Sequence, residues 1–233
     1  MRRYVVLNSK GGCGKTTVAT NLASLLAAGG MRVALYDYDP QGSSMRWFGL
    51  RGELFSPLQC INAQSGHSGV TRSFQLRVPP GTECAIVDTP ASLRRLELED
   101  LLRGADAVLV PVLPSAIDLH VSGDFLAGLG DILRQRGRQL PVGLVANRAR
   151  RNTRAYAELQ QAVIGWRRPL IATLRDTMYY PQAASAGLGI HELPGGATRI
   201  DRADWQAIRG WLESGRVAPA LDLGTQPAAL LAG

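Results

Sequence analysis

Several common features are scarce or missing in this chain of 233 residues. Its three cysteines, Cys13, Cys60 and Cys84, form no Cys-x-x-Cys pair, which argues against a disulfide framework. No uninterrupted apolar run reaches the roughly 18 residues that a membrane-spanning helix needs. No stretch of Gly, Ser and Pro is long enough for an interdomain linker, so we expect one domain over residues 1–214. Residues 215–233 are low in complexity, and we expect this tail to be loosely ordered.

Lysine is also nearly absent, because only two of the 26 basic residues are not arginine. Both lysines lie in one glycine-rich run, Lys10-Gly11-Gly12-Cys13-Gly14-Lys15-Thr16-Thr17. A short apolar segment precedes this run, and apolar residues at helical spacing follow it as far as Ala28. A strand, a glycine loop and a helix in this order predict a phosphate-binding loop, since glycines let backbone N–H groups turn toward an anion. We expect the loop to bind ATP from Gly11 to Thr17, with Lys15 on the β- and γ-phosphates and the Thr16 hydroxyl on Mg²⁺.

Acidic residues follow two further apolar segments. Segment 32–37 ends in Asp37 and continues into Tyr38-Asp39-Pro40-Gln41-Gly42, whereas segment 84–88 ends in Asp88. A single Asp after a strand is often only a turn residue, but three acids in this order after a phosphate loop indicate metal and catalytic groups. Asp88 is expected to hold Mg²⁺, as the acid at the end of a Walker B strand does.

Further apolar segments at 107–112 and 141–148 predict two more strands. Strands that alternate with helical segments predict an α/β fold with a mostly parallel sheet and helices on both faces. The ligand is then expected at the carboxyl ends of the strands, where the three motifs lie. Residues 56–81 show weak periodicity, and we expect an irregular excursion there.

The lysine at the start of the loop is unusual for a phosphate loop. With it, the run resembles the deviant Walker A motif of the ParA/MinD family of ATPases, and Asp37-Tyr38-Asp39-Pro40-Gln41-Gly42 is similar to another signature of that family. The resemblance extends from about Tyr4 to about Trp211. It implies a P-loop NTPase fold and an ATP-bound sandwich dimer, in which Lys10 reaches the ATP of the partner protomer.

The same resemblance assigns roles to other residues. Asp39 would orient the attacking water, and Asp37 would support Mg²⁺ and the switch region that follows it. Asn147 would face the adenine ring, which the region around Pro181 would cover from the other side. An Asn at the end of a strand is otherwise a common turn or cap residue.

Arginine is concentrated between Arg134 and Arg175, where ten arginines occur with a single acid, Glu158. A solvated arginine-rich face would account for this concentration. The resemblance instead implies that ATP-bound dimers bind nonspecific DNA, and that a ParB-like or cargo-adaptor partner stimulates hydrolysis. For the DNA contacts we select four residues: Arg151, Arg154, Arg199 and Arg202.

The resulting expectation is a cytoplasmic, nucleoid-associated ATPase that partitions or positions a plasmid, a chromosome or a protein cargo. Because the first predicted strand begins almost at Met1, we expect neither a signal peptide nor an N-terminal helix-turn-helix. A MinD-like membrane-associated regulator is one alternative, since segment 201–212 is amphipathic, although such a stripe more often docks on the core. An ATP-dependent metabolic ligase or synthetase on the same scaffold is the other alternative.

Overall fold

The centre of the molecule is a seven-stranded sheet whose strands are all parallel. The computed structural model describes residues 1–53, 55–64, 77–135, 137 and 139–215. The strand order is β3-β2-β4-β1-β5-β6-β7. The strands are β1 (Arg2–Val6), β2 (Val33–Asp37), β3 (Leu58–Asn62), β4 (Cys84–Asp88), β5 (Ala107–Val112), β6 (Val142–Ala149) and β7 (Leu170–Arg175).

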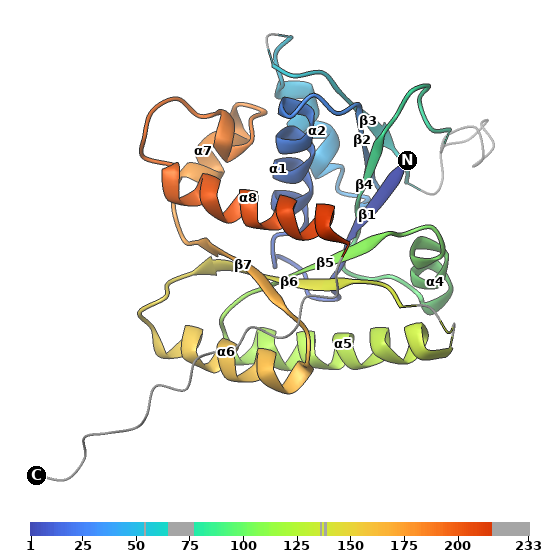
Figure 1. Ribbon diagram of the computed structural model, residues 1–233, viewed down its shortest axis with the longest axis vertical. Helices are drawn as coiled ribbons and strands as arrows, with labels where there is room; N and C mark the ends of the chain where they lie inside the picture. The colour runs from blue at the N-terminus through green and yellow to red at the C-terminus, as the bar shows by residue number, and fades with distance from the viewer. Residues whose placement is uncertain (54, 65–76, 136, 138, 216–233) are drawn as a thin grey trace, which may run out of the picture.

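Helices cover both faces of this sheet (Figure 1). One face packs against α1 (Lys15–Ala28), α2 (Ser43–Leu50), α7 (Tyr179–Ser185), the short 3₁₀ helix η1 (Ile190–Glu192) and α8 (Arg199–Ser214). The other face packs against α4 (Arg95–Arg103), α5 (Ala116–Gln135) and α6 (Arg154–Trp166). Strand residues alternate between these two cores, so that Tyr4 and Val6 join the first and Val5 and Leu7 the second.

The predicted α/β architecture is confirmed, and the strands predicted at 84–88 and 107–112 coincide with β4 and β5. The irregular excursion expected over 56–81 is wrong for β3, which pairs in parallel with β2. This strand lies at the edge of the sheet and only Leu58 in it is buried, so its sequence carries little apolar pattern. Its backbone hydrogen bonds to β2 hold it in place instead. Residues 65–76 of that segment, and 216–233 of the expected tail, lie outside the described residues.

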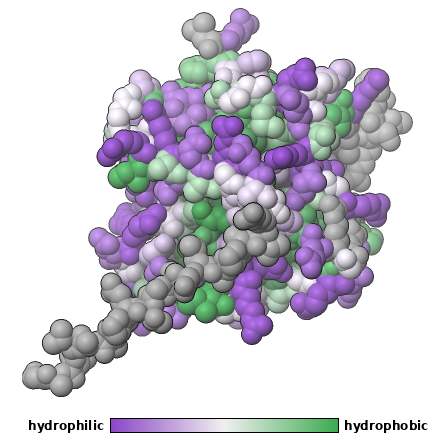
Figure 2. All heavy atoms as spheres, in the orientation of Figure 1, coloured by the Kyte–Doolittle hydropathy of each residue, from purple (hydrophilic) through white to green (hydrophobic). Residues whose placement is uncertain are grey.

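The amphipathic segment near the C-terminus forms α8. Its apolar stripe, which includes Trp205, Ile208 and Trp211, is buried on the sheet. The Trp205 indole donates a hydrogen bond of 3.1 Å to the Tyr180 hydroxyl. Hydrophilic side chains cover most of the face on which α8 lies, with hydrophobic ones scattered among them (Figure 2). None of the helices described is both long and apolar enough to cross a membrane.

Candidate functional site

The glycine-rich loop connects β1 to α1 at the carboxyl edge of the sheet. Gly12 and Gly14 have φ angles of 74° and 98°, in the left-handed region that favours glycine. A Cβ on Gly14 would lie 2.0 Å from the side-chain nitrogen of Asn147, so any larger residue there would displace Asn147. The N-terminus of α1 begins at Lys15, and the helix dipole favours an anion at that end. The loop therefore has the shape and polarity of a phosphate cradle.

Both lysines are held by neighbours within this single chain. The Lys15 ammonium is buried and donates to the Lys10 carbonyl at 3.0 Å. The Lys10 ammonium lies 3.5 Å from a carboxylate oxygen of Asp118 in the first turn of α5. The Lys10 side chain keeps 34% of its surface exposed, so it can reach solvent from this position.

Two carboxylates stand side by side at the ends of β2 and β4, because Asp37 and Asp88 are register partners. The Asp88 side chain is fully buried, and its Oδ2 accepts a hydrogen bond of 2.8 Å from the Ser44 hydroxyl. Its Oδ1 accepts no hydrogen bond from any residue that the structure describes. Burial raises the pKa of Asp88 to about 7, although the hydroxyls of Ser44 and Thr16 oppose this shift.

Asp37 is also fully buried, and burial raises its pKa. Its Oδ1 accepts a hydrogen bond of 3.1 Å from the Asp39 backbone N–H, and its Oδ2 accepts one of 2.9 Å from that of Met45. Asp37 therefore anchors the turn between β2 and α2. Asp39 is only half-buried in that turn, and its Oδ1 accepts from the Gln41 backbone N–H at 2.9 Å.

The phosphate loop and Asp39 open into one cleft of about 1000 Å³. Its lining comes from the phosphate loop, the turn after β2, the segment after β4 and two arginines. Among these residues are Gly11, Gly12, Gly14, Lys15, Thr16, Thr17, Asp39, Pro40, Pro90, Ala91, Arg3 and Arg148. Magnesium prefers carboxylate and hydroxyl oxygens. Since Thr16 faces the cleft and the buried Asp88 has an oxygen without a donor, this set of residues fits Mg²⁺.

Of the two residues expected at the adenine ring, Asn147 is buried and Pro181 is exposed. Asn147 is buried beneath the loop, where its side-chain amide donates a hydrogen bond of 2.8 Å to the Cys13 carbonyl. Pro181 lies exposed on α7. Neither is among the described residues that line the cleft.

The arginine-rich region is less positive than its sequence suggests. Five arginines between 134 and 175 form ion pairs: Arg134 with Asp131, Arg150 with Asp176, Arg151 with Asp204, Arg154 with Glu158 and Arg175 with Asp201. Four of these five acids lie outside that stretch of sequence. Acids from outside residues 134–175 therefore offset much of the positive charge of this region.

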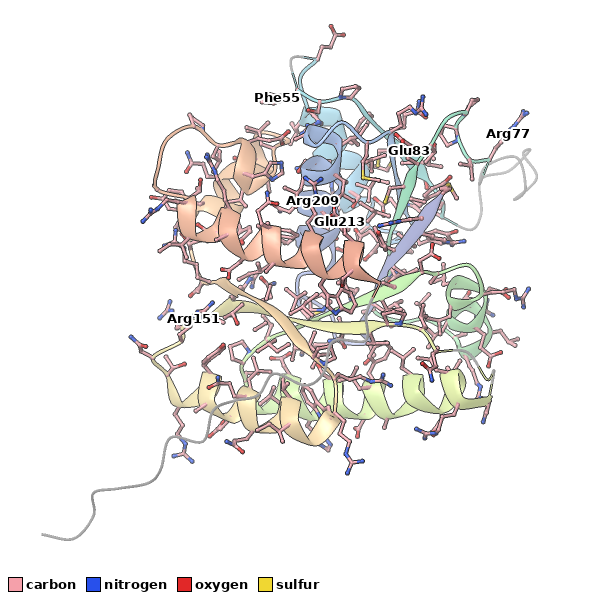
Figure 3. All side chains as sticks on the ribbon, viewed as in Figure 1. Phe55, Arg77, Glu83, Arg151, Arg209 and Glu213 are labelled. Carbon is pink, nitrogen blue, oxygen red and sulfur yellow. The ribbon has the colours of Figure 1, made fainter. Side chains whose placement is uncertain are left out.

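The four arginines selected for DNA contacts lie in two parts of the chain. Arg151 and Arg154 follow β6 and are both exposed, and Figure 3 shows Arg151 near the start of this connection. Arg199 is exposed at the first residue of α8. Arg202 instead donates hydrogen bonds to the carbonyls of Leu193 at 2.6 Å and Gly195 at 3.3 Å, so it fastens the loop before α8.

The sequence interpretation missed two residues of this site. Ser44 holds Asp88, and Arg148 lines the cleft. Ser44 follows the acidic turn closely enough to have been considered, but only folding shows that its hydroxyl reaches β4. Arg148 was noted as the last residue of the apolar segment 141–148, next to Asn147, and as part of an arginine-rich stretch, but it was given no role at the site.

Comparisons with known proteins agree with this geometry. A model of the CobQ/CobB/MinD/ParA nucleotide-binding domain matches residues 4–190. Maintenance of carboxysome distribution protein A from Halothiobacillus neapolitanus is 31% identical over 189 residues, which make up 81% of this chain and 86% of that protein.

Two solved structures share the fold. A putative plasmid partition protein from Borrelia burgdorferi bound to AMPPNP has a TM-score of 0.71 and 17% identity, covering 92% of this chain and 99% of that one. Cobyrinic acid a,c-diamide synthase from Mycobacterium smegmatis, with an ATP analogue and magnesium, has a TM-score of 0.69 and 22% identity, covering 94% of this chain and 99% of that one.

Proposed function

Because the chain belongs to the CobQ/CobB/MinD/ParA family of nucleotide-binding domains, we propose that it is a ParA-like ATPase that positions a cellular cargo. The observation that carries this proposal is the convergence of the phosphate loop and Asp39 at one cleft, with the buried Asp88 at the end of the strand that leads to the cleft lining at Pro90. The name of the relative from Halothiobacillus makes a protein microcompartment the first cargo to test. Plasmids and chromosomes are the other candidate cargoes.

The chemistry follows from the positions of the side chains. Backbone N–H groups of the loop and the Lys15 ammonium would bind the phosphates of ATP. Thr16 and Asp88 would hold Mg²⁺, with Asp37 supporting them by fixing the turn after β2. The metal ion, when bound, would offset charge on the phosphates. Asp39 lines the cleft on an anchored turn, a position from which its carboxylate would orient the attacking water.

Lys10 is proposed to act on the ATP of a partner protomer in a sandwich dimer. In the single chain its ammonium is next to Asp118, so dimerisation would draw Lys10 away from that carboxylate. The dimer would bind nonspecific nucleoid DNA in the cytoplasm through exposed arginines such as Arg151, Arg154 and Arg199. A ParB-like or cargo-adaptor partner would then stimulate slow hydrolysis and release the dimer.

The test is co-sedimentation of the purified protein with nonspecific duplex DNA, and separately with anionic liposomes, under ATP, ADP or no nucleotide. ATP-dependent capture by DNA that weakens with salt supports the proposal, and Lys15→Ala is the control that should remove it. Capture by liposomes would favour the membrane-associated regulator, even though the apolar stripe of α8 is buried. ATP binding without either capture would favour the metabolic ligase or synthetase.

A further inference from the structure

Arg148 has a backbone conformation that its place in the chain does not explain. Its φ angle is 48°, and Arg167 is the one other non-glycine residue with a positive φ in the described part of the chain. Arg167 caps the C-terminus of α6, where a left-handed residue is common. Arg148 instead lies within β6, so this conformation is strained and needs a local cause.

The cause lies in the pairing of β6 with β7, whose register shifts between Ala146 and Ala149. Such a bulge redirects the side chains of the residues that it contains. Here it separates two neighbours, because Asn147 is buried against the phosphate loop whereas Arg148 is exposed and lines the cleft. The irregularity thus exposes Arg148 to the cleft that the glycines of the loop also line.

The environment of this guanidinium also differs from that of its neighbours in sequence. Arg150, Arg151 and Arg154 each pair with a carboxylate. The Arg148 side chain forms no hydrogen bond or ion pair with any residue in the described ranges. This guanidinium, in a strained residue that lines the cleft with the phosphate loop, is available to an anionic ligand.

We propose that Arg148 is a further nucleotide-binding residue whose guanidinium contacts the phosphate chain of the nucleotide bound in the cleft. This proposal rests on the proposed function, since it uses the same nucleotide and the same loop. A guanidinium suits the role because its planar fork of donors matches phosphate oxygens and stays charged at any relevant pH. Two neighbouring residues of the bulge then have separate tasks: Asn147 holds the loop through the Cys13 carbonyl, and Arg148 binds the phosphates.

The experiment compares Arg148→Gly, Arg148→Lys and Arg167→Gly with the wild type, by titrating each full-length protein with ATP and with ADP in the presence of Mg²⁺. Arg148→Gly should weaken ATP binding by roughly 10- to 100-fold, as expected for a lost hydrogen bond to a charged group. Arg148→Lys should recover part of this loss, and wild-type affinity should fall more steeply with salt than that of Arg148→Gly. Arg167→Gly is the matched control, because it removes the same charge and the same positive-φ side chain without lining the cleft.

Thermal unfolding without nucleotide excludes a folding defect, since glycine accepts a positive φ and both glycine variants should keep or raise the wild-type Tm. Unchanged ATP affinity in Arg148→Gly, with the wild type binding ATP, would overturn the assignment of Arg148 and leave the proposed function intact. A loss that is insensitive to salt and not recovered by Arg148→Lys would overturn the phosphate contact. A wild type that binds neither nucleotide would overturn the proposed function together with this assignment.

Discussion

Replacing Asp88 with Asn should stabilise the nucleotide-free protein at pH 8 while removing its response to Mg²⁺. The buried Asp88 carboxyl has a pKa of about 7, compared with an ordinary value of 3.8. The folded state therefore binds more protons than the unfolded state between about pH 4 and pH 7, and the free energy of unfolding falls as pH rises through this window. The difference of about three pKa units corresponds to roughly 4 kcal/mol at pH 8, because each unit contributes about 1.4 kcal/mol.

The amide of Asp88→Asn cannot ionise, so the variant avoids this cost and can still accept the hydrogen bond from Ser44. At pH 8 its Tm should exceed that of the wild type by up to roughly 8 to 16 °C, from a sensitivity of about 2 to 4 °C per kcal/mol for a chain of this size. At pH 4.5 the difference in the free energy of unfolding should shrink to about 1 kcal/mol. The assay is thermal and urea unfolding from pH 4.5 to 8 in EDTA.

Other groups titrate in the same range, so the quantity to compare is the difference between the two proteins. The raised pKa of Asp37 acts with the same sign as that of Asp88, and the lowered pKa of His191 acts with the opposite sign below about pH 6.5. Both contributions are present in the wild type and in the variant. Ser44→Ala provides a control, because losing its hydrogen bond should raise the pKa of Asp88 further, so that the stability of this variant keeps falling to a higher pH than that of the wild type.

Mg²⁺ with ATP should then stabilise the wild type most at pH 8, where the carboxylate is ionised, and should stabilise Asp88→Asn much less. If the wild type and Asp88→Asn lost stability in parallel between pH 4.5 and 8, the reasoning about the buried carboxylate would be refuted. An equal response of both proteins to Mg²⁺ would remove Asp88 from the metal site.

Four further predictions concern the nucleotide and the core. Lys15→Ala should abolish ATP binding in a titration, since it removes the buried ammonium at the phosphate loop; binding within a few-fold of wild type would contradict this role. Asp39→Ala should bind ATP but lose hydrolysis, and it should stay dimeric in size-exclusion chromatography. Lys10→Ala should bind ATP but lose the turnover that the partner protein stimulates. Normal turnover in either variant would exclude the role assigned to that residue. Glu192→Ala should lower the free energy of unfolding, measured in urea, by about 3 to 5 kcal/mol, because it leaves the buried guanidinium of Arg51 without its carboxylate. A loss below about 1 kcal/mol would show that solvent replaces the carboxylate.

The sequence predicted the sheet and the loop well because both depend on local chemistry. Glycines that need positive φ angles and apolar segments that end in an acid are visible in the chain itself, and β4 was predicted with its observed limits. The edge strand β3 was missed because pairing with β2, rather than burial, holds it in place. The charge of the arginine-rich region was overestimated because its acidic partners, such as Asp201 and Asp204, are distant in sequence. Contacts between segments that are distant in sequence, such as these ion pairs and the pairing of β3 with β2, could not be predicted.

Helix α2 shows how such contacts join the site to the rest of the fold. Near its N-terminus, the Ser44 hydroxyl holds Asp88 and the Met45 backbone N–H holds Asp37.

Toward its C-terminus, the Trp47 indole donates to the Leu188 carbonyl, and Arg51 forms a buried ion pair of 2.6 Å with Glu192. The two segments also touch along their backbones, since a Cβ on Gly187 would lie 2.4 Å from the Arg51 nitrogen. Because close-packed contacts of this kind leave no room for sliding, a displacement of Ser44 must either move the segment from 187 to 192 or break the Arg51–Glu192 pair. The oxygen atoms that would meet Mg²⁺ and the segment that precedes α8 are therefore mechanically connected through a single helix of eight residues.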